Sequence, residues 1–301
     1  MIEKIIVKSP ATSANFGCGF DCVGIAYNAH NTFIIYPNQK KDDLPFRGEK
    51  LLRLSYEKAF AYKGETPVPM FVRQIQGLPS SRGLGSSATS IIGGILGANE
   101  LMEHKLSQQE ILDLATEIEG HPDNVAPCFL GGFVASIKGL PLMIHKMGVN
   151  NKLRFILLSP NFEMSTQKAR AILPEKITMS DAVYDLSRAF FLEDALKYGD
   201  LNNLRLCLDD KWHVPYRKDM IKDYAIFEQY AAANRLPFTI SGSGSTLLMI
   251  SDKEHVEGHA AALKEMIDKK IYCDKMLEAQ WSVKVYTCNT HGATTEVIYE
   301  K

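Results

Sequence analysis

The sequence predicts an α+β protein built in two halves that divide near residue 150. Segments with strand-like alternation of apolar and polar residues are mixed with segments of helical spacing, and they do not follow a strict strand–helix–strand order. The 301 residues are enough for one large domain or two modest ones. A content of 46% hydrophobic and 23% charged residues is typical of globular proteins.

In the first half, strands are expected at residues 2–8, 32–36 and 68–75. Helices are expected at residues 49–64, 87–104 and 107–120. The third helix has the clearest limits, because Ser107 and Glu110 match a capping box and Gly120 matches a C-terminal stop. The segment "HPDNVAP", residues 121–127, is predicted to be a loop because prolines at both ends of it break regular structure. Strands are also expected at residues 131–137 and 153–160, on either side of the division.

The second half is expected to be richer in helix. Helical spacing predicts a short helix at 165–173, stopped by Pro174, and longer ones at 180–200, 222–236 and 253–270. The stretch "FTISGSGSTLLMIS", residues 238–251, has the pattern of a strand, a glycine turn and a second strand. Strands at 281–287 and 295–301 close the chain.

Charge and cysteine usage narrow the functional classes. A net charge of −1 provides no overall basic field for nucleic acid. No apolar stretch approaches the roughly 20 residues of a membrane span, and the first residues, "MIEKIIVKSP", have a strand pattern and not that of a signal peptide. The six cysteines are scattered without a CxxC pair, so we expect reduced thiols in a cytoplasmic protein.

The stretch "PSSRGLGSSATS", residues 79–90, joins a glycine loop directly to an apolar helix. Such a loop can bind an anion, because glycines let backbone N–H groups turn inward and the first helical N–H groups have no partners of their own. A Walker loop is excluded since no lysine follows Gly85, and a dinucleotide fingerprint lacks its third glycine at Ala88. A surface turn capped by serine remains the alternative on these residues alone.

The same stretch closely resembles the nucleotide loop of the GHMP kinases, which include galactokinase, homoserine kinase and mevalonate kinase. Three further stretches agree in the family's order: "SPATSANFGCGFDCVG" at 9–24, "EGHPDNVAPCFLGG" at 119–132 and "ISGSGSTLL" at 240–248. The stretches at 9–24 and 119–132 look like those of homoserine kinases in particular.

The resemblance implies a two-domain fold with the active site between the domains. It implies an N-terminal ATP-binding half over residues 1–150, ribosomal protein S5 domain 2-like, and a C-terminal ferredoxin-like α/β-plait half over residues 151–301. It further implies an ATP- and Mg²⁺-dependent kinase that phosphorylates the side-chain hydroxyl of L-homoserine, a step toward threonine. The expected partners are small molecules, without nucleic acid or membrane, and the oligomeric state is left open, a homodimer included.

By resemblance, the nucleotide is bound by the glycine loop and the first turn of its helix. These residues are Pro79, Ser80, Ser81, Arg82, Gly83, Leu84, Gly85, Ser86, Ser87, Ala88 and Thr89. Ser87 is implied as a Mg²⁺ ligand together with a carboxylate of the next helix, for which Glu117 is the best match. Glu119 is the rival, because the helix end can be aligned two residues differently. Mg²⁺ needs few carboxylates beside phosphate oxygens.

The acceptor site must recognise a small zwitterion that carries a hydroxyl. Arginine provides a planar fork of donors for a carboxylate, and Arg170 and Arg217 fit the family's pattern. Asp21 is the candidate for the ammonium, and Asn15 for the same group or the hydroxyl. The resemblance adds the remaining substrate contacts, which are His121, Asp123, Asn124, Thr166, Gly242 and Ser243.

The proton acceptor is the open question of the chemistry. The family's usual aspartate is replaced in homoserine kinases by an asparagine, here Asn124, and an amide does not accept a proton at neutral pH. We therefore expect Asn124 to orient the hydroxyl while the proton leaves to the phosphate or to solvent. Asp123 is the neighbouring alternative base, although the resemblance gives it a binding role, and Arg170 completes the expected catalytic group.

Two other functions remain compatible with the sequence. One is a GHMP kinase with another small hydroxyl acceptor, of the mevalonate or shikimate type. The other is a non-catalytic binding module on the same fold, since the N-terminal half shares its fold with a ribosomal-protein domain. Arg170, Arg217 and Asp21 together favour an amino-acid acceptor over the first. The net charge of −1 and the presence of Glu117 argue against RNA binding by the second.

Overall fold

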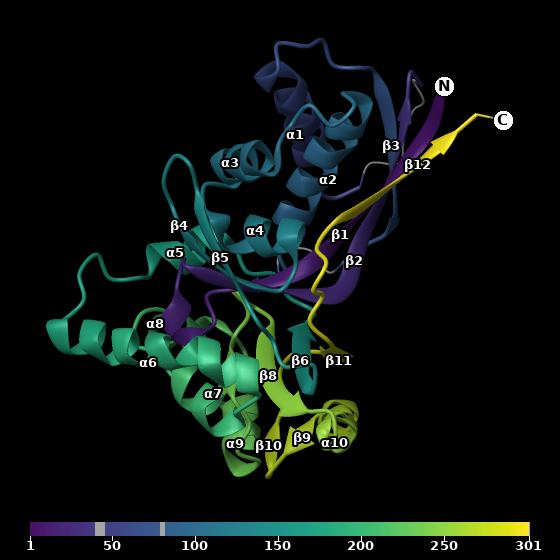
Figure 1. The fold of residues 1–301 in the computed structure, drawn as a ribbon. Coiled ribbons are helices and arrows are strands. Elements are labelled where there is room, and N and C mark those ends of the chain that lie inside the picture. The colour runs from purple at the N-terminus through teal and green to yellow at the C-terminus, as the bar shows by residue number, and fades with distance from the viewer. Residues whose placement is uncertain (40–45, 79–81, 301) are drawn as a thin grey trace.

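The chain folds into two antiparallel sheets, each covered by helices, in a computed structural model that describes residues 1–39, 46–78 and 82–300 (Figure 1). The first sheet has the order β12-β1-β2-β4-β5, with β3 also paired to β2, and the second has the order β11-β6-β8-β7. The strands of the first sheet are β1 (Ile2–Ala14), β2 (Val23–Pro37), β3 (Met70–Gln76), β4 (Phe133–Ile137), β5 (Met143–Met147) and β12 (Thr294–Tyr299). Those of the second are β6 (Leu153–Pro160), β7 (Phe238–Ile240), β8 (Leu247–Asp252) and β11 (Trp281–Tyr286), and β9 (Ile271–Tyr272) and β10 (Lys275–Met276) form a separate hairpin.

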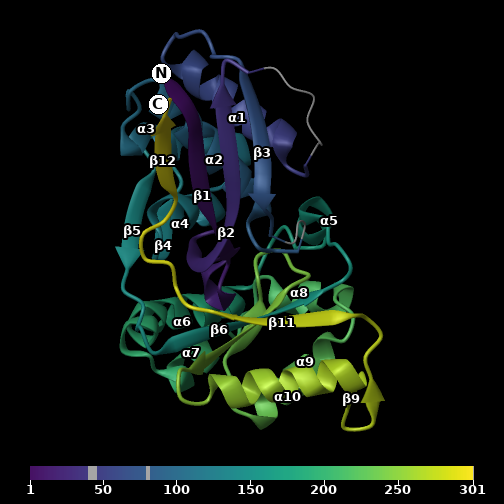
Figure 2. The same cartoon turned by 90° about the vertical axis from the view of Figure 1, so that its right-hand side faces the viewer.

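Helices of the first half cover one face of the first sheet, behind its strands in Figure 2. They are α1 (Glu49–Tyr62), α2 (Ser86–Leu101), α3 (Gln108–Glu119) and α4 (Pro122–Leu130). Helix α2 is buried along most of its length, in contact with β1, β2 and α1. The predicted limits of α3 are confirmed: Ser107 and Glu110 form the capping box, and Gly120 ends the helix at a φ of 93°.

One prediction for this half is wrong. Residues 121–127 were expected to form a loop, but they begin α4. Pro122 is the first helical residue, where the missing N–H costs nothing, and Pro127 is accommodated inside the short helix. Helix α4 therefore presents its first turn, and not a loop, to the glycine stretch.

The second half adds helices on both faces of its sheet. They are α5 (Thr166–Ala171), α6 (Met179–Tyr198), α7 (Leu201–Cys207), α8 (Val214–Arg217), α9 (Tyr224–Ala233) and α10 (Val256–Lys269), with a short 3₁₀ turn at Lys218–Met220. A second short 3₁₀ turn, at Gly17–Gly19, belongs to the first half. Apolar side chains of β6 and β8 pack with α9 and α10 on one face. On the other face, Phe155 and Leu248 pack with Phe16 and Phe133 of the first half. A hydrophobic core thus joins the two halves and fixes the space between them.

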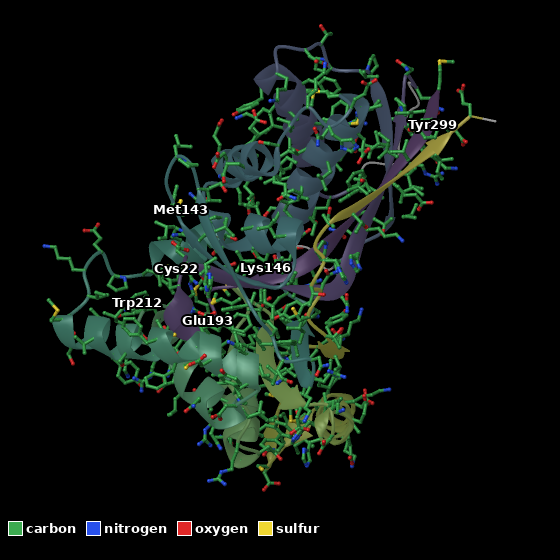
Figure 3. The ribbon with its side chains drawn as sticks, in the orientation of Figure 1. Cys22, Met143, Lys146, Glu193, Trp212 and Tyr299 are labelled. Carbon is green, nitrogen blue, oxygen red and sulfur yellow. The ribbon has the colours of Figure 1, made fainter. Side chains whose placement is uncertain are left out.

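The last strand, β12, returns to the first sheet and pairs antiparallel with β1. Tyr299, near its end, lies far from the second half (Figure 3). The division near residue 150 stays a prediction. Because β12 pairs with β1, the last strand of the chain belongs to the first sheet and not to the second half. Among the described residues, no helix is both long and apolar enough to cross a membrane.

Candidate active site

A cavity of about 480 Å³ lies between the halves. Its walls come from the end of β1, the glycine loop and the start of α2, the α3–α4 junction, α5, α8 and the β7–β8 turn. The predicted residues that line it are Asn15, Asp21, Gly83, Leu84, Gly85, Ser86, Ser87, His121, Asp123, Asn124, Thr166, Arg170, Arg217, Gly242 and Ser243. Four motifs that are far apart in the sequence are therefore brought to one site.

The described residues among the other predicted nucleotide residues do not line the cavity. Pro79, Ser80 and Ser81 lie outside the described residues. Arg82 does not line the cavity, and its Nη2 donates to the Asn161 carbonyl at 3.4 Å. Ala88 and Thr89 are buried within α2, where they pack the helix and do not line the cavity.

The glycine loop is held by hydrogen bonds from the turn between β7 and β8. The Thr246 N–H donates to the Arg82 carbonyl at 3.0 Å, and Ser241 Oγ donates to the Gly83 carbonyl at 2.5 Å. The "SGSGST" turn, residues 241–246, therefore packs against this loop. Gly85 has a φ of 63°, and a Cβ there would lie 1.9 Å from Thr12 Oγ1, so only glycine fits without displacement. Its neighbour Ser86 begins α2, whose first N–H groups and dipole favour an anion.

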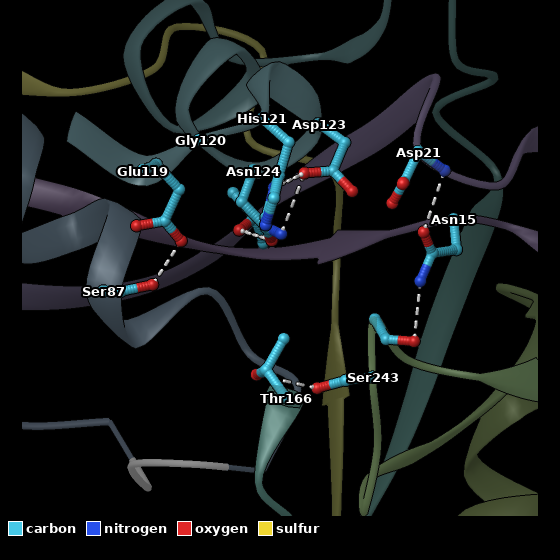
Figure 4. Close-up of polar contacts among 12 residues, drawn as sticks. Asn15, Asp21, Ser87, Glu119, Gly120, His121, Asp123, Asn124, Thr166 and Ser243 are labelled. Carbon is cyan, nitrogen blue, oxygen red and sulfur yellow. Dashed lines mark hydrogen bonds and ion pairs between the residues drawn. The ribbon is translucent and has the colours of Figure 1, made fainter. Parts of the chain in front are cut away.

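Glu119, and not Glu117, accompanies Ser87. Ser87 Oγ donates to Glu119 Oε1 at 2.5 Å (Figure 4), whereas the Glu117 side chain is 66% exposed and its carboxylate contacts Lys58 Nζ at 2.9 Å. The pairing of Ser87 with Glu117 is thus corrected, because two residues along a helix turn a side chain to another face. Burial raises the pKa of Glu119, because the carboxylate loses hydration when it is removed from water.

These two residues fit a magnesium ion. A hydroxyl and a carboxylate are hard oxygen donors, as Mg²⁺ prefers, and they lie at the N-terminus of α2 where phosphates are expected. No group of three or more His, Cys, Asp or Glu residues that could hold a metal by itself occurs in the described ranges. The ion would therefore share its coordination with phosphate oxygens, as Mg²⁺ usually does in phosphoryl transfer.

The first turn of α4 carries a linked set of polar side chains. His121 Nδ1 lies 2.7 Å from Asp123 Oδ1, and Asn124 Nδ2 donates to the same oxygen at 3.4 Å (Figure 4). Thr12 Oγ1 donates to Asn124 Oδ1 at 2.7 Å, which fixes the amide. The hydrogen bond to Asp123 raises the pKa of His121, since the buried carboxylate stabilises the imidazolium.

The opposite end of the cavity is rich in charge. Arg170 donates to both oxygens of Asp21, at 2.6 and 2.9 Å. Asn15 Oδ1 accepts the Asp21 N–H at 3.1 Å, and its Nδ2 donates to the Gly242 carbonyl at 2.7 Å (Figure 4). Thr166 and Ser243 hydroxyls lie 3.3 Å apart at the same end.

Arg217 is a cation buried within the protein, with only 2% of its surface exposed. Its Nε donates to the Ala169 carbonyl at 2.9 Å. Burial and then the charge of Arg170 lower the pKa of Arg217 to about 10. A buried guanidinium held by neutral carbonyls favours an anionic ligand, because the ligand would supply the missing negative charge.

Some residues in or next to the cavity were not predicted. Thr12, which bonds Asn124, stands inside the quoted motif at 9–24, so its hydroxyl could have been singled out there. Arg47, Gly48 and Leu51 line the cavity from the start of α1 and carried no signal in the sequence. Arg47 forms an ion pair with Glu163 of the second half.

The fold, the glycine loop at a helix N-terminus and the two charged ends of the cavity define a small-molecule kinase of the GHMP class. Residues 51–132 match the family model of the GHMP kinases N terminal domain. The chain is similar to a homoserine kinase of Clostridium botulinum strain Okra, with 39% identity over 82% of this chain and 86% of that protein, and to one of Clostridium beijerinckii, with 36% identity over 96% and 98%. A crystal structure of homoserine kinase from Cytophaga hutchinsonii matches with a TM-score of 0.85, at 28% identity and 98% coverage of both chains. The chain belongs to the homoserine kinase family of the GHMP kinases, and the predicted family and fold are confirmed.

Proposed function

We propose that this protein transfers the γ-phosphoryl group of ATP to the side-chain hydroxyl of L-homoserine, which yields O-phospho-L-homoserine and ADP. One observation carries the proposal: a single cavity has an anion-binding helix N-terminus at one end and both an acid and two arginines at the other. The names of the relatives and the family membership support the same reaction. The scattered cysteines support a cytoplasmic location.

At the nucleotide end, the backbone N–H groups of the glycine loop and of Ser86 would bind the triphosphate. Ser87 and Glu119 would hold Mg²⁺. When bound, the ion would neutralise part of the negative charge on the phosphates. This arrangement suits phosphoryl transfer, which depends mainly on positioning and charge stabilisation.

At the acceptor end, Arg217 and Arg170 would bind the carboxylate of the amino acid. Asp21 and Asn15 would bind its ammonium, so that the substrate's two charges replace part of the Arg170–Asp21 pairing. His121, Thr166, Gly242 and Ser243 would line the rest of this end.

We assign Asn124 the role of orienting the substrate hydroxyl. Thr12 and Asp123 hold its amide from two sides. Asp123 is engaged by His121 Nδ1, which supports a binding role over that of a base. The proton would leave to the phosphate or to solvent. In Asp123→Asn, a fall in turnover of several orders with unchanged substrate affinity would overturn this assignment in favour of Asp123 as the base.

The reaction is tested by ADP release with L-homoserine, L-serine, mevalonate and shikimate as acceptors. Only L-homoserine should stimulate release strongly, and the product should be O-phospho-L-homoserine. Stimulation by mevalonate or shikimate in its place would assign the protein to another acceptor, and no stimulation by L-homoserine would refute the proposal.

A further inference from the structure

Phe20 contacts both arginines of the acceptor end. Its ring centroid lies 5.2 Å from Arg217 Cζ and 5.7 Å from Arg170 Cζ. Both distances are within the range of a cation–π interaction, in which the negative face of the ring attracts a cation. One aromatic ring therefore contacts both guanidinium groups that, in the proposed function, bind the carboxylate of the acceptor.

A second aromatic ring supports the first. His213 stacks on Phe20 with a centroid distance of 5.4 Å and an interplanar angle of 28°. The His213 side chain is fully buried, so it does not reach a substrate itself. Burial lowers the pKa of His213 to about 4, which keeps the ring neutral beside two cations.

The backbone of the segment that contains His213 is held by the side chain of Asp210. Asp210 Oδ1 accepts the N–H groups of Trp212, His213 and Val214 at 2.8, 2.7 and 3.2 Å. The His213 carbonyl accepts the Arg217 N–H at 3.1 Å, at the start of α8. The same segment thus places the stacking ring and the buried guanidinium.

Arg217 and Arg170 repel each other, since each carries a positive charge within one small region. Arg170 is compensated by Asp21, whereas the hydrogen bonds of the Arg217 side chain go to the carbonyls of Ala169 and Gly242. A ring face next to Arg217 offsets some of this repulsion without competing for the substrate's carboxylate, because it offers no full negative charge.

We propose that Phe20 and His213 form an aromatic stack that holds the two guanidinium groups in position to bind the carboxylate of the acceptor. In this arrangement Phe20 is a specificity-determining residue, and His213 and Asp210 are positioning residues. The proposal rests on the proposed function and names how its acceptor end selects amino acids. It assigns the segment 210–217 a part in substrate selection, although of that segment only Arg217 lines the cavity.

The first test removes the ring of Phe20. In Phe20→Leu, KM for L-homoserine should rise about tenfold, whereas kcat and KM for ATP should stay within about twofold of the parent. Titration calorimetry should give the same loss in L-homoserine affinity without turnover. Phe20→Tyr, which keeps the ring, should restore most of the affinity.

The second test separates stacking from simple burial at position 213. His213→Phe keeps a ring against Phe20 and should retain L-homoserine affinity, whereas His213→Leu should lose about as much as Phe20→Leu. His259→Leu is the matched control, because His259 also packs against an aromatic ring, that of Tyr230, but on α10 away from the cavity. Thermal melting of every variant reports on folding.

The outcomes distinguish the two proposals. If the parent enzyme neither binds nor phosphorylates L-homoserine, the proposed function fails. If the parent is active but Phe20→Leu changes L-homoserine affinity less than twofold, or changes both substrates equally, the stack is overturned. If Phe20→Leu does not fold, the comparison of His213→Phe with His213→Leu decides, and equal affinity in those two variants refutes the proposal.

Discussion

Arg170 and Asp21 form a two-point ion pair across the cavity, from α5 of the second half to the loop that precedes β2 of the first. The hydrogen bond with Asp21 raises the pKa of Arg170, so the guanidinium stays charged. The pair presents to the cavity the two charges, opposite in sign, that a zwitterion requires.

Arg170→Lys should raise KM for L-homoserine by about tenfold to a hundredfold, because a lysine cannot present two parallel donors. Steady-state kinetics would measure this, and KM for ATP should be almost unchanged. The alcohol analogue L-homoserinol, which lacks the carboxylate, should be equally poor with parent and variant. Arg154→Lys, at a site where the guanidinium contacts only backbone carbonyls of its own segment, is the control. A similar loss for both acceptors in Arg170→Lys would contradict carboxylate binding by this residue.

Glu119→Gln should lower kcat by about a hundredfold or more and raise the Mg²⁺ concentration needed for half-maximal activity, since a neutral amide is a weaker ligand. Glu117→Gln is a matched control on the same helix. It should leave both quantities within about twofold, because the exposed pair with Lys58 contributes at most about 1 kcal/mol. A Mg²⁺ titration of both variants checks this, and a greater loss in Glu117→Gln would reverse the assignment.

Gly85→Ala should raise KM for ATP and lower kcat, each by about tenfold or more, because the new Cβ would displace Thr12 and with it Asn124. Gly64→Ala tests the backbone strain alone. Its φ of 71° is similar, but a Cβ there meets no atom within 4 Å. The melting temperature should fall somewhat in both variants, whereas activity should fall only in Gly85→Ala. Equal activities would show that the close approach at Gly85 does not matter.

The buried His213 should make the fold sensitive to acid. Its pKa is about 4 in the folded state and about 6.5 when unfolded, so the unfolded chain binds more protons between these values. Stability should therefore fall as pH drops from about 6.5 to about 4, by roughly 3 kcal/mol in all from this one group. The charges of Asp210 and Asp21 raise the pKa of His213 and that of Arg217 lowers it, but burial is the largest cause of the shift.

Urea unfolding of the parent and of His213→Phe at several pH values would measure that contribution. The variant should show a shallower loss of stability between pH 6.5 and 4. His104→Gln, which replaces a histidine whose side chain is 68% exposed, should retain the slope of the parent. Parallel slopes for parent and His213→Phe would mean that His213 is not kept neutral by the fold.

Local patterns predicted much of the fold, and the resemblance to the GHMP kinases predicted most of the residues that line the cavity. The capping box at Ser107 and the glycine loop before α2 depend on neighbours in sequence, and both were identified. The α4 helix was missed because Pro127 lies inside it, and tertiary packing outweighs that local cost. Glu119 could not be separated from Glu117, although the end of α3 was predicted correctly, because the sequence does not indicate which carboxylate of the last turn faces Ser87.

The contacts at the acceptor end could not be predicted without the fold. The motif at 9–24 supplied Asp21, but nothing in the sequence indicates that Phe20 beside it contacts two arginines from α5 and α8. Likewise, the residues next to His213 in the sequence do not indicate that its side chain is buried. Contacts between residues so far apart in the sequence are set by the packing of the two halves, which local periodicity does not encode.

The return of β12 to β1 has a consequence for dissecting this protein into pieces. The Glu300 N–H donates to the Met1 carbonyl at 3.0 Å, and six residues of β1 are in register with the last strand. A fragment that ends at residue 150 would leave the outer hydrogen-bonding edge of β1 open, and an open strand edge invites pairing with other copies and aggregation. A nucleotide-binding fragment for separate study would therefore need β12 grafted back beside β1, for example through a short linker at its amino end.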